Sequence, residues 1–429
     1  MRNRNIFIFY LVSIFALISC GKDRTEEYIE QTQENQWIYN TMKEVYLWKE
    51  YIKELQQAEF FNSQEKFFSS LLHKDDKASF MTETLAINDY GMSIATMRDP
   101  IAEKPSQIYA LVLFVEPNSP AAAAGIRRGM WISSINGESL TTSSQSELEK
   151  GDAKTLTTEY IEFDNEENKH FWVQGETINL AASAEYEICN IGFDNIYTVR
   201  DKKIGYMLCN NFNGDNFIEK ANGVMEKFIA SDVSDIIIDL RYNTGGKISN
   251  AALLASMLVP SDLNGTPFCT LKDNTETVDT IYNYTEQQFC AGEKKIHFIT
   301  GEATKGTAEL LVHSVNASRD MYDVFVIGAK SSGVNIMIEE FESPYGFSIS
   351  PATAIIYISN GEKMTADGIK PDYAYDELKN KNSIYPLGDE QEYLLYNTCY
   401  IIATGTAPSL SNHITGYTIS TPNRTSFIR

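Results

Sequence analysis

The sequence predicts a multidomain α+β protein, with a small helical module first, a β-rich domain next and an α/β core after it. Three patterns predict this order: helical spacing of apolar residues over 27–55, strand-like periodicity over 79–190, and alternating strand and helix segments from residue 195 onward. At 429 residues, the chain is long enough for two or three domains.

The composition is typical of a globular protein, and its charge is strongly acidic. Apolar residues make up 43% and aromatic residues 12%, which is enough for a sizeable core. Lys and Arg number 36 against 58 Asp and Glu, a formal net charge of -22. That balance repels phosphate backbones, so it argues against nucleic acid as a partner. Nothing in the sequence predicts an oligomeric state.

Residues 1–19 have the pattern of a secretory signal peptide. An apolar run from Ile6 to Leu17 follows a basic start and is too short to cross a bilayer as a mature helix. It ends in Leu-Ile-Ser-Cys-Gly, which resembles the lipobox of bacterial lipoproteins and implies lipid attachment at Cys20. A plain N-terminal anchor or a conventional signal is the alternative. The lipoprotein interpretation predicts a lipid anchor in the bacterial cell envelope, facing the periplasm or the cell surface.

Residues 20–78 are predicted to form a polar tether followed by a helical module. One face of a first helix, over 27–55, is predicted to carry Ile38, Met42, Val45 and Lys49. A second helix is predicted over 64–72, ending at a polar run.

The β-rich domain is assigned to residues 79–190. Tyr109–Val115 is an apolar run typical of a buried strand. A short helix is then predicted between Ser119, a favoured N-cap residue, and Gly125, a favoured helix end. Asn136-Gly137 predicts a tight hairpin turn.

The segment around this short helix resembles half of a PDZ domain, through the pattern S-P-A-x-x-A-G-I-x-x-G. Met130 departs from it, because an Asp usually follows the last glycine. The resemblance implies that a peptide carboxylate is held by the backbone of a loop made of Gly91, Met92, Ser93 and Ile94. It also implies an extended peptide added to a sheet edge. The alternative is a β-rich domain whose turns are merely similar.

Residues 191–378 are predicted to form the α/β core, with strands buried on both faces. The predicted strands are 203–208, 234–240, 295–300 and 324–328, and the predicted helices are 216–230, 250–258 and 309–315. Residues 379–429 form a C-terminal extension to which no structure is assigned.

An ordered series of glycine-containing motifs runs through this core. D-L-R-Y-N-T-G-G, from Asp239 to Gly246, follows an Ile-rich strand, and paired glycines there let backbone N–H groups approach a ligand oxygen. Its companions are I-G-Y at 204–206, Phe212, and the segments 301–309, 328–333 and 367–372. The series resembles the C-terminal processing (tail-specific) serine peptidases, over roughly residues 28–378 with the PDZ-like segment. That family implies a helical cap, a PDZ domain and a ClpP/crotonase-like core.

The same resemblance implies a serine nucleophile with a lysine as general base, and both positions are substituted. The nucleophile run [T/S]-A-S-A-S-E reads T-K-G-T-A-E, with Gly306 at the serine position. The base run G-E-x-T-x-G-K reads G-A-K-S-S-G-V, with Val334 at the lysine position. A serine hydroxyl needs an adjacent base to attack a carbonyl. The sequence therefore predicts a pseudopeptidase without catalytic residues.

Groups that would hold a carbonyl oxygen are retained at Gly245, Gly246 and the backbone N–H of Thr307. A substitute dyad of Thr307 and Lys330 is conceivable, but its two side chains must lie within hydrogen-bond reach. The competing interpretation makes Thr307 a helix N-cap, with Lys305 and Lys330 as solvated loop charges.

No metal or cofactor site is predicted, because the five histidines are scattered and the cysteines lack zinc-ligand spacing. Cys269 and Cys290 are candidates for a local disulfide bond. The favoured hypothesis is a lipid-anchored protein that binds a peptide or an unstructured protein segment. The alternatives are an active serine- or threonine-type endopeptidase with relocated residues, and a structural lipoprotein with vestigial clefts.

Overall fold

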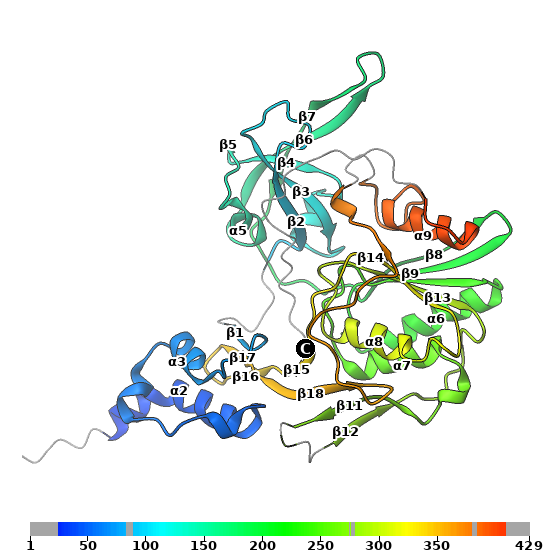
Figure 1. Cartoon of the computed structure of the whole chain (residues 1–429). Helices are drawn as coiled ribbons and strands as arrows, with labels where there is room; N and C mark the ends of the chain where they lie inside the picture. Colours follow the sequence, from blue (N-terminus) through cyan, green and yellow to red (C-terminus); the bar gives the residue numbers. More distant parts are fainter. Residues whose placement is uncertain (1–24, 83–88, 274, 276–278, 380–383, 409–429) are drawn as a thin grey trace, which may run out of the picture.

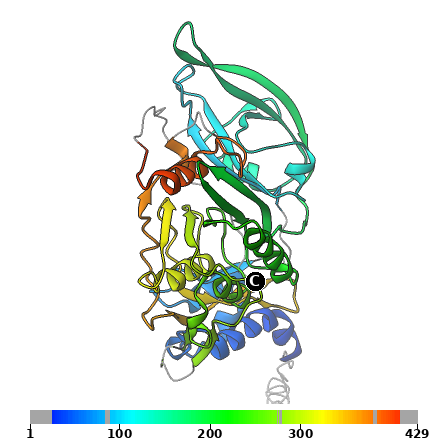
Figure 2. The same cartoon turned by 90° about the vertical axis from the view of Figure 1, so that its right-hand side faces the viewer.

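The computed structural model describes residues 25–82, 89–273, 275, 279–379 and 384–408. It confirms a multidomain α+β protein with a helical N-terminal region and β-rich sheets. Figures 1 and 2 show three tiers, with the N-terminal helices at one end, the α/β core in the middle and the β-rich sheet at the other end. The predicted signal peptide and Cys20 lie outside the described residues. Within the described residues, no helix has the length and apolar character needed to cross a membrane.

The N-terminal tier is built from two α-helices that pack through aromatic and aliphatic side chains. It contains α2 (Thr25–Val45), α3 (Gln64–Leu71) and two short 3-10 helices, η1 (Lys49–Tyr51) and η2 (Gln57–Phe61). The expectation of one helix over 27–55 is wrong, because the N–H of Leu47 donates to the carbonyl of Ala352 at 2.7 Å and leaves the helix ladder. Ile38 and Met42 are buried as predicted, while Val45 and Lys49 stay partly exposed.

A small antiparallel sheet joins this tier to the core. Its strand order is β1 (Phe80–Thr82), β17 (Ser348–Ser350) and β16 (Phe341–Glu342). Phe347, Ile349 and Ala352 belong to the same hydrophobic cluster as Ile38 and Met42. The helical tier therefore shares a hydrophobic core with the chain segment over residues 347–352.

The β-rich tier is an antiparallel sheet with two short helices. The strand order is β2 (Met92–Arg98), β3 (Ile108–Val115), β4 (Trp131–Ile135), β6 (Lys154–Asp164) and β7 (Lys169–Leu180), with β5 (Glu138–Ser139) paired to β4. The helices are α4 (Pro120–Ala123) and α5 (Ser144–Glu149). The Ser119 hydroxyl caps α4 by accepting the N–H of Ala122 at 3.2 Å. Both residues of the predicted hairpin turn have positive φ, 51° at Asn136 and 86° at Gly137.

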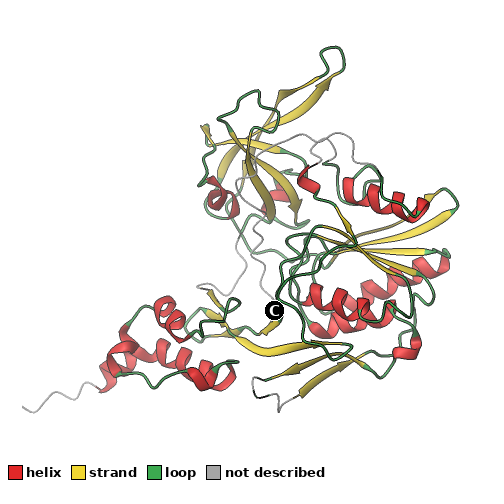
Figure 3. Ribbon diagram, in the orientation of Figure 1, coloured by secondary structure: helices red, strands yellow, loops and turns green. Residues whose placement is uncertain are grey.

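The core is a six-stranded, mostly parallel sheet with helices on both faces (Figure 3). Its order is β19 (Tyr373–Ala374), β14 (Val324–Gly328), β13 (Lys295–Thr300), β10 (Asp235–Asp239), β9 (Lys202–Cys209) and β8 (Ile191–Val199), with only β8 antiparallel to its neighbour. One face is covered by α6 (Phe217–Ala230), α7 (Ile248–Leu258) and α8 (Thr307–Asn316). Along each strand, every second side chain points to the other face, where α9 (Tyr393–Thr404) packs.

A four-stranded antiparallel sheet lies beside the helices α7 and α8. Its order is β12 (Asp279–Asn283), β11 (Pro267–Lys272), β18 (Ala352–Ile358) and β15 (Ile336–Ile338), and the short turns η3 (Ser261–Leu263) and η4 (Glu377–Lys379) complete the described elements. Cys269 on β11 is buried in the core and Cys290 bonds through its thiol to the carbonyl of Gln287. Both thiols are free, so the disulfide considered for this pair does not form.

Candidate functional site

The turn that enters α8 has the backbone geometry of a nucleophile turn, without a side chain at its tip. Gly306 sits there with φ 60° and ψ -122°, a conformation in which a residue with a Cβ is strained. Its N–H donates to Glu309 Oε2 at 3.1 Å, and its carbonyl accepts the N–H of Leu310 at 3.0 Å. The surrounding helix therefore fixes this conformation although no reactive group occupies it.

Glu309 joins this turn to the loop that follows β14. Its carboxylate is fully buried and accepts the N–H of Gly333 at 2.6 Å and that of Val334 at 2.8 Å. The hydroxyl of Ser331 donates to the same carboxylate. Burial raises the pKa of Glu309, and these donors oppose that rise. One carboxylate thus holds the backbone of Val334 near the turn of Gly306, and the valine side chain offers no base.

A third loop, between β10 and α7, carries the two glycines predicted to hold an oxyanion. Gly245 has φ 112° and Gly246 has φ 128°, so both need the freedom of glycine. The Thr307 hydroxyl donates to the carbonyl of Gly246 at 2.8 Å, which places this loop beside the start of α8.

Gly245 and Gly246 differ in whether their backbone N–H already has a protein acceptor. The N–H of Gly245 is occupied, because it donates to the side chain of Asn243 at 2.8 Å. Among the described residues, by contrast, none accepts the N–H of Gly246 or of Thr307. Two backbone N–H groups on adjacent loops thus lack a protein acceptor within the described chain.

The substitute dyad of Thr307 and Lys330 does not form in this structure. Thr307 is the first helical residue of α8 and not its N-cap, which is Gly306, and its hydroxyl is engaged with Gly246. Lys330 is exposed, and within the described part of the chain its ammonium makes no hydrogen bond or ion pair. The site brings Thr307 to Gly246 and leaves Lys330 in solvent.

Lys305 differs from the solvated charge expected for it. Its side chain is half-buried, and burial lowers the pKa of its amine, with a smaller opposing effect from Glu309. Its backbone N–H donates to the carbonyl of Asn243 at 3.1 Å, which ties the turn to the glycine loop. Sequence reasoning missed this partly desolvated amine because the burial of a loop residue depends on the packing around it.

The four residues predicted to form a carboxylate loop lie mostly in a strand. Met92, Ser93 and Ile94 begin β2 and pair with β3. Gly91 precedes the strand with φ 74°, and its N–H donates to the Asp89 side chain at 2.7 Å. The local aspartate already takes the donor that a ligand carboxylate would use. β2 is nevertheless an end strand of its sheet.

A buried charge cluster that sequence reasoning missed connects three segments near the glycine loop. Arg241 contacts Asp239 at 2.7 Å and Glu392 at 2.6 Å, and Arg128 contacts Glu377 at 2.9 Å and Glu392 at 3.2 Å. Burial would raise the pKa of Glu392, but Arg241 and Arg128 together hold it below its ordinary value. Asp239 and Arg241 belong to the D-L-R motif, whereas Arg128, Glu377 and Glu392 lie more than a hundred residues from Arg241 in the sequence.

Comparisons with known proteins agree with this geometry. Residues 203–375 match the profile described as "Peptidase family S41", and residues 33–80 match "Peptidase S41 N-terminal domain". A protein described as a CtpA-like serine protease of Staphylococcus aureus (strain COL) is 26% identical over 265 residues, 61% of this chain and 49% of that protein. The chain thus matches about half the length of such curated relatives.

Solved structures show the same fold. An S41 protease from Bacteroides fragilis NCTC 9343 superposes with a TM-score of 0.75 and 25% identity, over 86% of this chain and 97% of that chain. The photosystem II D1 C-terminal processing protease superposes with a TM-score of 0.53 at 15% identity, over 88% of this chain and 98% of that chain. The second likeness concerns the fold alone.

Proposed function

This chain belongs to peptidase family S41, and we propose that it is a non-catalytic member that binds peptides or unstructured protein segments without cleaving them. We place it in the bacterial cell envelope, attached to a membrane through a lipid on Cys20. The lipobox-like sequence before Cys20 supports the anchor, and the family supports a peptide as the ligand.

The observation that carries the proposal is Gly306 at the tip of the turn into α8. The backbone there keeps φ 60° and ψ -122°, and Glu309 keeps its four donors, yet glycine has no atom that could attack a carbonyl. Loss of the nucleophile of a serine peptidase lowers turnover on the order of a millionfold.

Val334 removes the second half of the chemistry. Its side chain cannot accept a proton, so no base would activate a hydroxyl placed at position 306. The half-buried amine of Lys305 and the hydroxyl of Thr307 lie on the same turn, but the Thr307 hydroxyl is committed to Gly246. Two independent substitutions thus support loss of catalysis over relocation.

Peptide binding is supported by what the loops retain. The N–H groups of Gly246 and Thr307 lack protein acceptors within the described chain, and an extended peptide offers carbonyl oxygens that fit them. The net charge of -22 favours association with basic peptides, and this preference weakens as salt screens it. PDZ-like use of the β2 edge is a further part of the proposal.

The decisive experiment uses the mature chain from Asp23 with casein as an unstructured substrate, beside Thr307→Ala and a Gly306→Ser/Val334→Lys double variant. We expect no cleavage by the unmodified protein and measurable cleavage by the double variant, with folding checked by circular dichroism. Cleavage by the unmodified protein that disappears in Thr307→Ala would overturn the proposal.

Binding is measured separately, by fluorescence anisotropy of labelled unstructured peptides with a net positive charge. Gly246→Ala adds a Cβ about 2.9 Å from the Asn213 N–H nitrogen and is expected to weaken binding at least tenfold. Gly223→Ala, on the exposed side of α6 with open space around it, is the matched control. Absence of any peptide binding by the unmodified chain would instead favour a purely structural role.

A further inference from the structure

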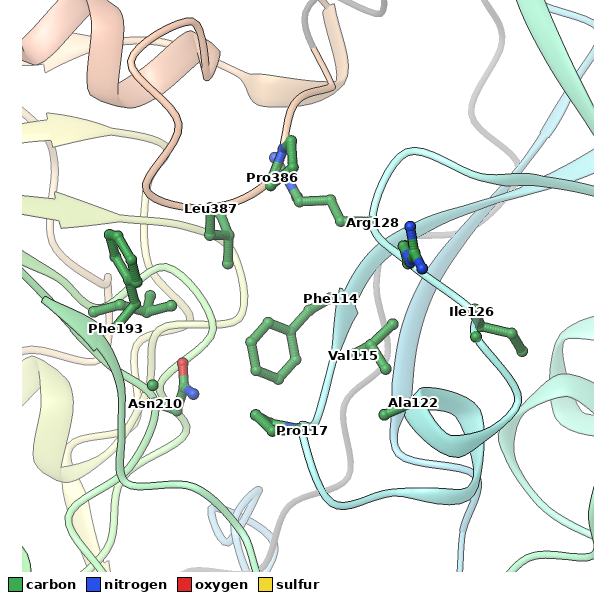
Figure 4. A pocket seen from close by; sticks show the side chains of 14 residues that line it. Phe114, Val115, Pro117, Ala122, Ile126, Arg128, Phe193, Asn210, Pro386 and Leu387 are labelled. Carbon is green, nitrogen blue, oxygen red and sulfur yellow. The ribbon is translucent and has the colours of Figure 1, made fainter.

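A pocket of about 450 Å³ lies between the β-rich tier and the core, away from the turn of Gly306. Figure 4 shows two of its sides, with Phe114 at the end of β3 pointing toward the side of Phe193 on β8 and Val115 pointing toward Ala122 and Ile126. The segment of Pro386 and Leu387 closes a third side. Its volume is that of a small-molecule pocket, and such pockets are frequent where domains meet.

The walls of the pocket are mostly apolar. Phe114 is buried and stacks on Tyr242 with ring centroids 5.3 Å apart, while the Phe193 ring is 40% exposed and rests on Gly388. Ala122 on α4 contributes only a methyl group and so leaves space open. A ligand with a flat aromatic or branched aliphatic body would fit between these walls.

Two arginines line the pocket, and only one of them is free. Arg128 is committed to Glu377 and Glu392, so its charge is neutralised inside the protein. Arg127 is exposed, and within the described chain its guanidinium has no hydrogen bond or ion pair. The two residues are the only charged members of the lining, so the pocket carries one unpaired positive charge.

Asn210 supplies a second unsatisfied group. Its side chain is 1% exposed, and neither its amide nitrogen nor its amide oxygen has a partner within the described structure. It lines the pocket, and Figure 4 shows it between Phe193 and Phe114. Gly192 leaves room for it, since a Cβ there would lie 2.7 Å from the amide nitrogen. Buried amides nearly always have partners, so this one points to an occupant.

We propose that this pocket binds a small amphipathic anion, a molecule with an apolar body and a single carboxylate or sulfonate group. The anion would pair with Arg127, the body would lie between Phe114 and Phe193, and a polar atom of the ligand would reach Asn210. Because residues of both tiers form the walls, the ligand would also hold the β-rich sheet against the core. The site is separate from the proposed peptide cleft and does not depend on it.

The test uses two fluorescent probes that share one apolar body and differ in charge, anilinonaphthalene sulfonate and phenylnaphthylamine. Arg127→Gln is expected to weaken binding of the sulfonate at least tenfold and to leave the neutral probe within twofold. Arg98→Gln, another exposed arginine, is the matched control for net charge. Equal weakening of the sulfonate by both arginine variants would overturn the proposal, because it would show a general charge effect.

Two further variants test the location. Ala122→Trp should fill the pocket and abolish binding of both probes. Asn210→Leu should raise the melting temperature of the free protein, since it removes an unsatisfied amide, and should weaken the sulfonate probe. Probe binding that Ala122→Trp leaves unchanged would place the probes elsewhere and overturn the proposal. Binding of the labelled basic peptides, measured on the same variants, reports separately on the proposed function.

Discussion

At the scale of single residues, the site is defined by the backbone conformation at position 306, which is present although no reactive side chain occupies that position. Gly306 holds φ 60° and ψ -122°, which a serine would adopt only with strain. With glycine, the turn keeps its shape at no steric cost.

The strain at this position can be measured directly. Gly306→Ala is expected to lower the free energy of unfolding by about 1–3 kcal/mol, because alanine is disfavoured at this φ and ψ. Gly223→Ala, at a solvent-exposed position in the middle of helix α6 with ordinary φ, should raise the free energy of unfolding by about 0.5–1 kcal/mol. Urea denaturation checks both, and equal effects of the two variants would contradict the strained turn.

Lys305 provides a second residue-level prediction. Burial lowers the pKa of its amine, so the reactive neutral form is reached at lower pH. Competitive acetylation read by mass spectrometry should give a midpoint at lower pH for Lys305 in the folded protein than for the same lysine in the chain unfolded in urea. Because pH midpoints are compared and not acetylation rates, slower access of the reagent to a half-buried amine does not affect the result. Coinciding midpoints would show that Lys305 is solvated.

At the scale of elements, the sequence predicts local structure well and contacts between distant segments poorly. The strands expected over 295–300 and 324–328 coincide with β13 and β14, because an apolar run bounded by turn residues is a local signal. The helix over 27–55 fails at Val45, where a tertiary hydrogen bond from Leu47 replaces the helical one. No helix is predicted for the segment of α9, since its buried face is defined only by its packing against the sheet.

The candidate site shows the same difference between local signals, which the sequence predicts, and contacts between distant segments, which it does not. The substitutions at Gly306 and Val334 are apparent from motif spacing, whereas the geometry that joins their loops depends on contacts of Glu309 with residues more than twenty positions away. The occupied N–H of Gly91 and the half-buried amine of Lys305 also depend on folded neighbours.

Glu309 should therefore control the order of the loop after β14. Glu309→Gln replaces an acceptor of four donors by a group that can satisfy fewer, with an expected loss of about 1–3 kcal/mol in unfolding free energy. Amide hydrogen exchange at Gly333 and Val334 should accelerate. Glu226→Gln, on the exposed side of α6, is the control. Unchanged exchange at both amides would show that the carboxylate does not hold this loop.

At the scale of the whole molecule, the β-rich tier is attached to the core through apolar packing and one guanidinium. One face of its sheet, with Leu111 and Trp131, packs in the same cluster as Tyr242 of the core. Arg128 adds contacts to Glu377, Glu392 and the Tyr242 hydroxyl, the last at 2.9 Å.

Removal of that guanidinium should loosen the two tiers. Arg128→Gln leaves buried carboxylates short of a cation, and we expect a loss of about 3 kcal/mol in the stability of the docked arrangement. Limited proteolysis and differential scanning calorimetry should show earlier release of the β-rich tier. The adjacent Arg127→Gln, at an exposed position, should change stability by no more than about 0.5 kcal/mol. Equal effects of both variants would mean that the buried cluster does not join the tiers.

The Arg128 contact also sets how often the two tiers are apart. If the contacts of Arg128 contribute about 3 kcal/mol to docking, they lower the separated fraction to roughly one part in a hundred or two of its value without them. A ligand that can enter only after separation then binds with an apparent affinity reduced by that fraction. A thin extended chain that enters without separating the tiers avoids this penalty, so a single buried arginine would select ligands by their bulk.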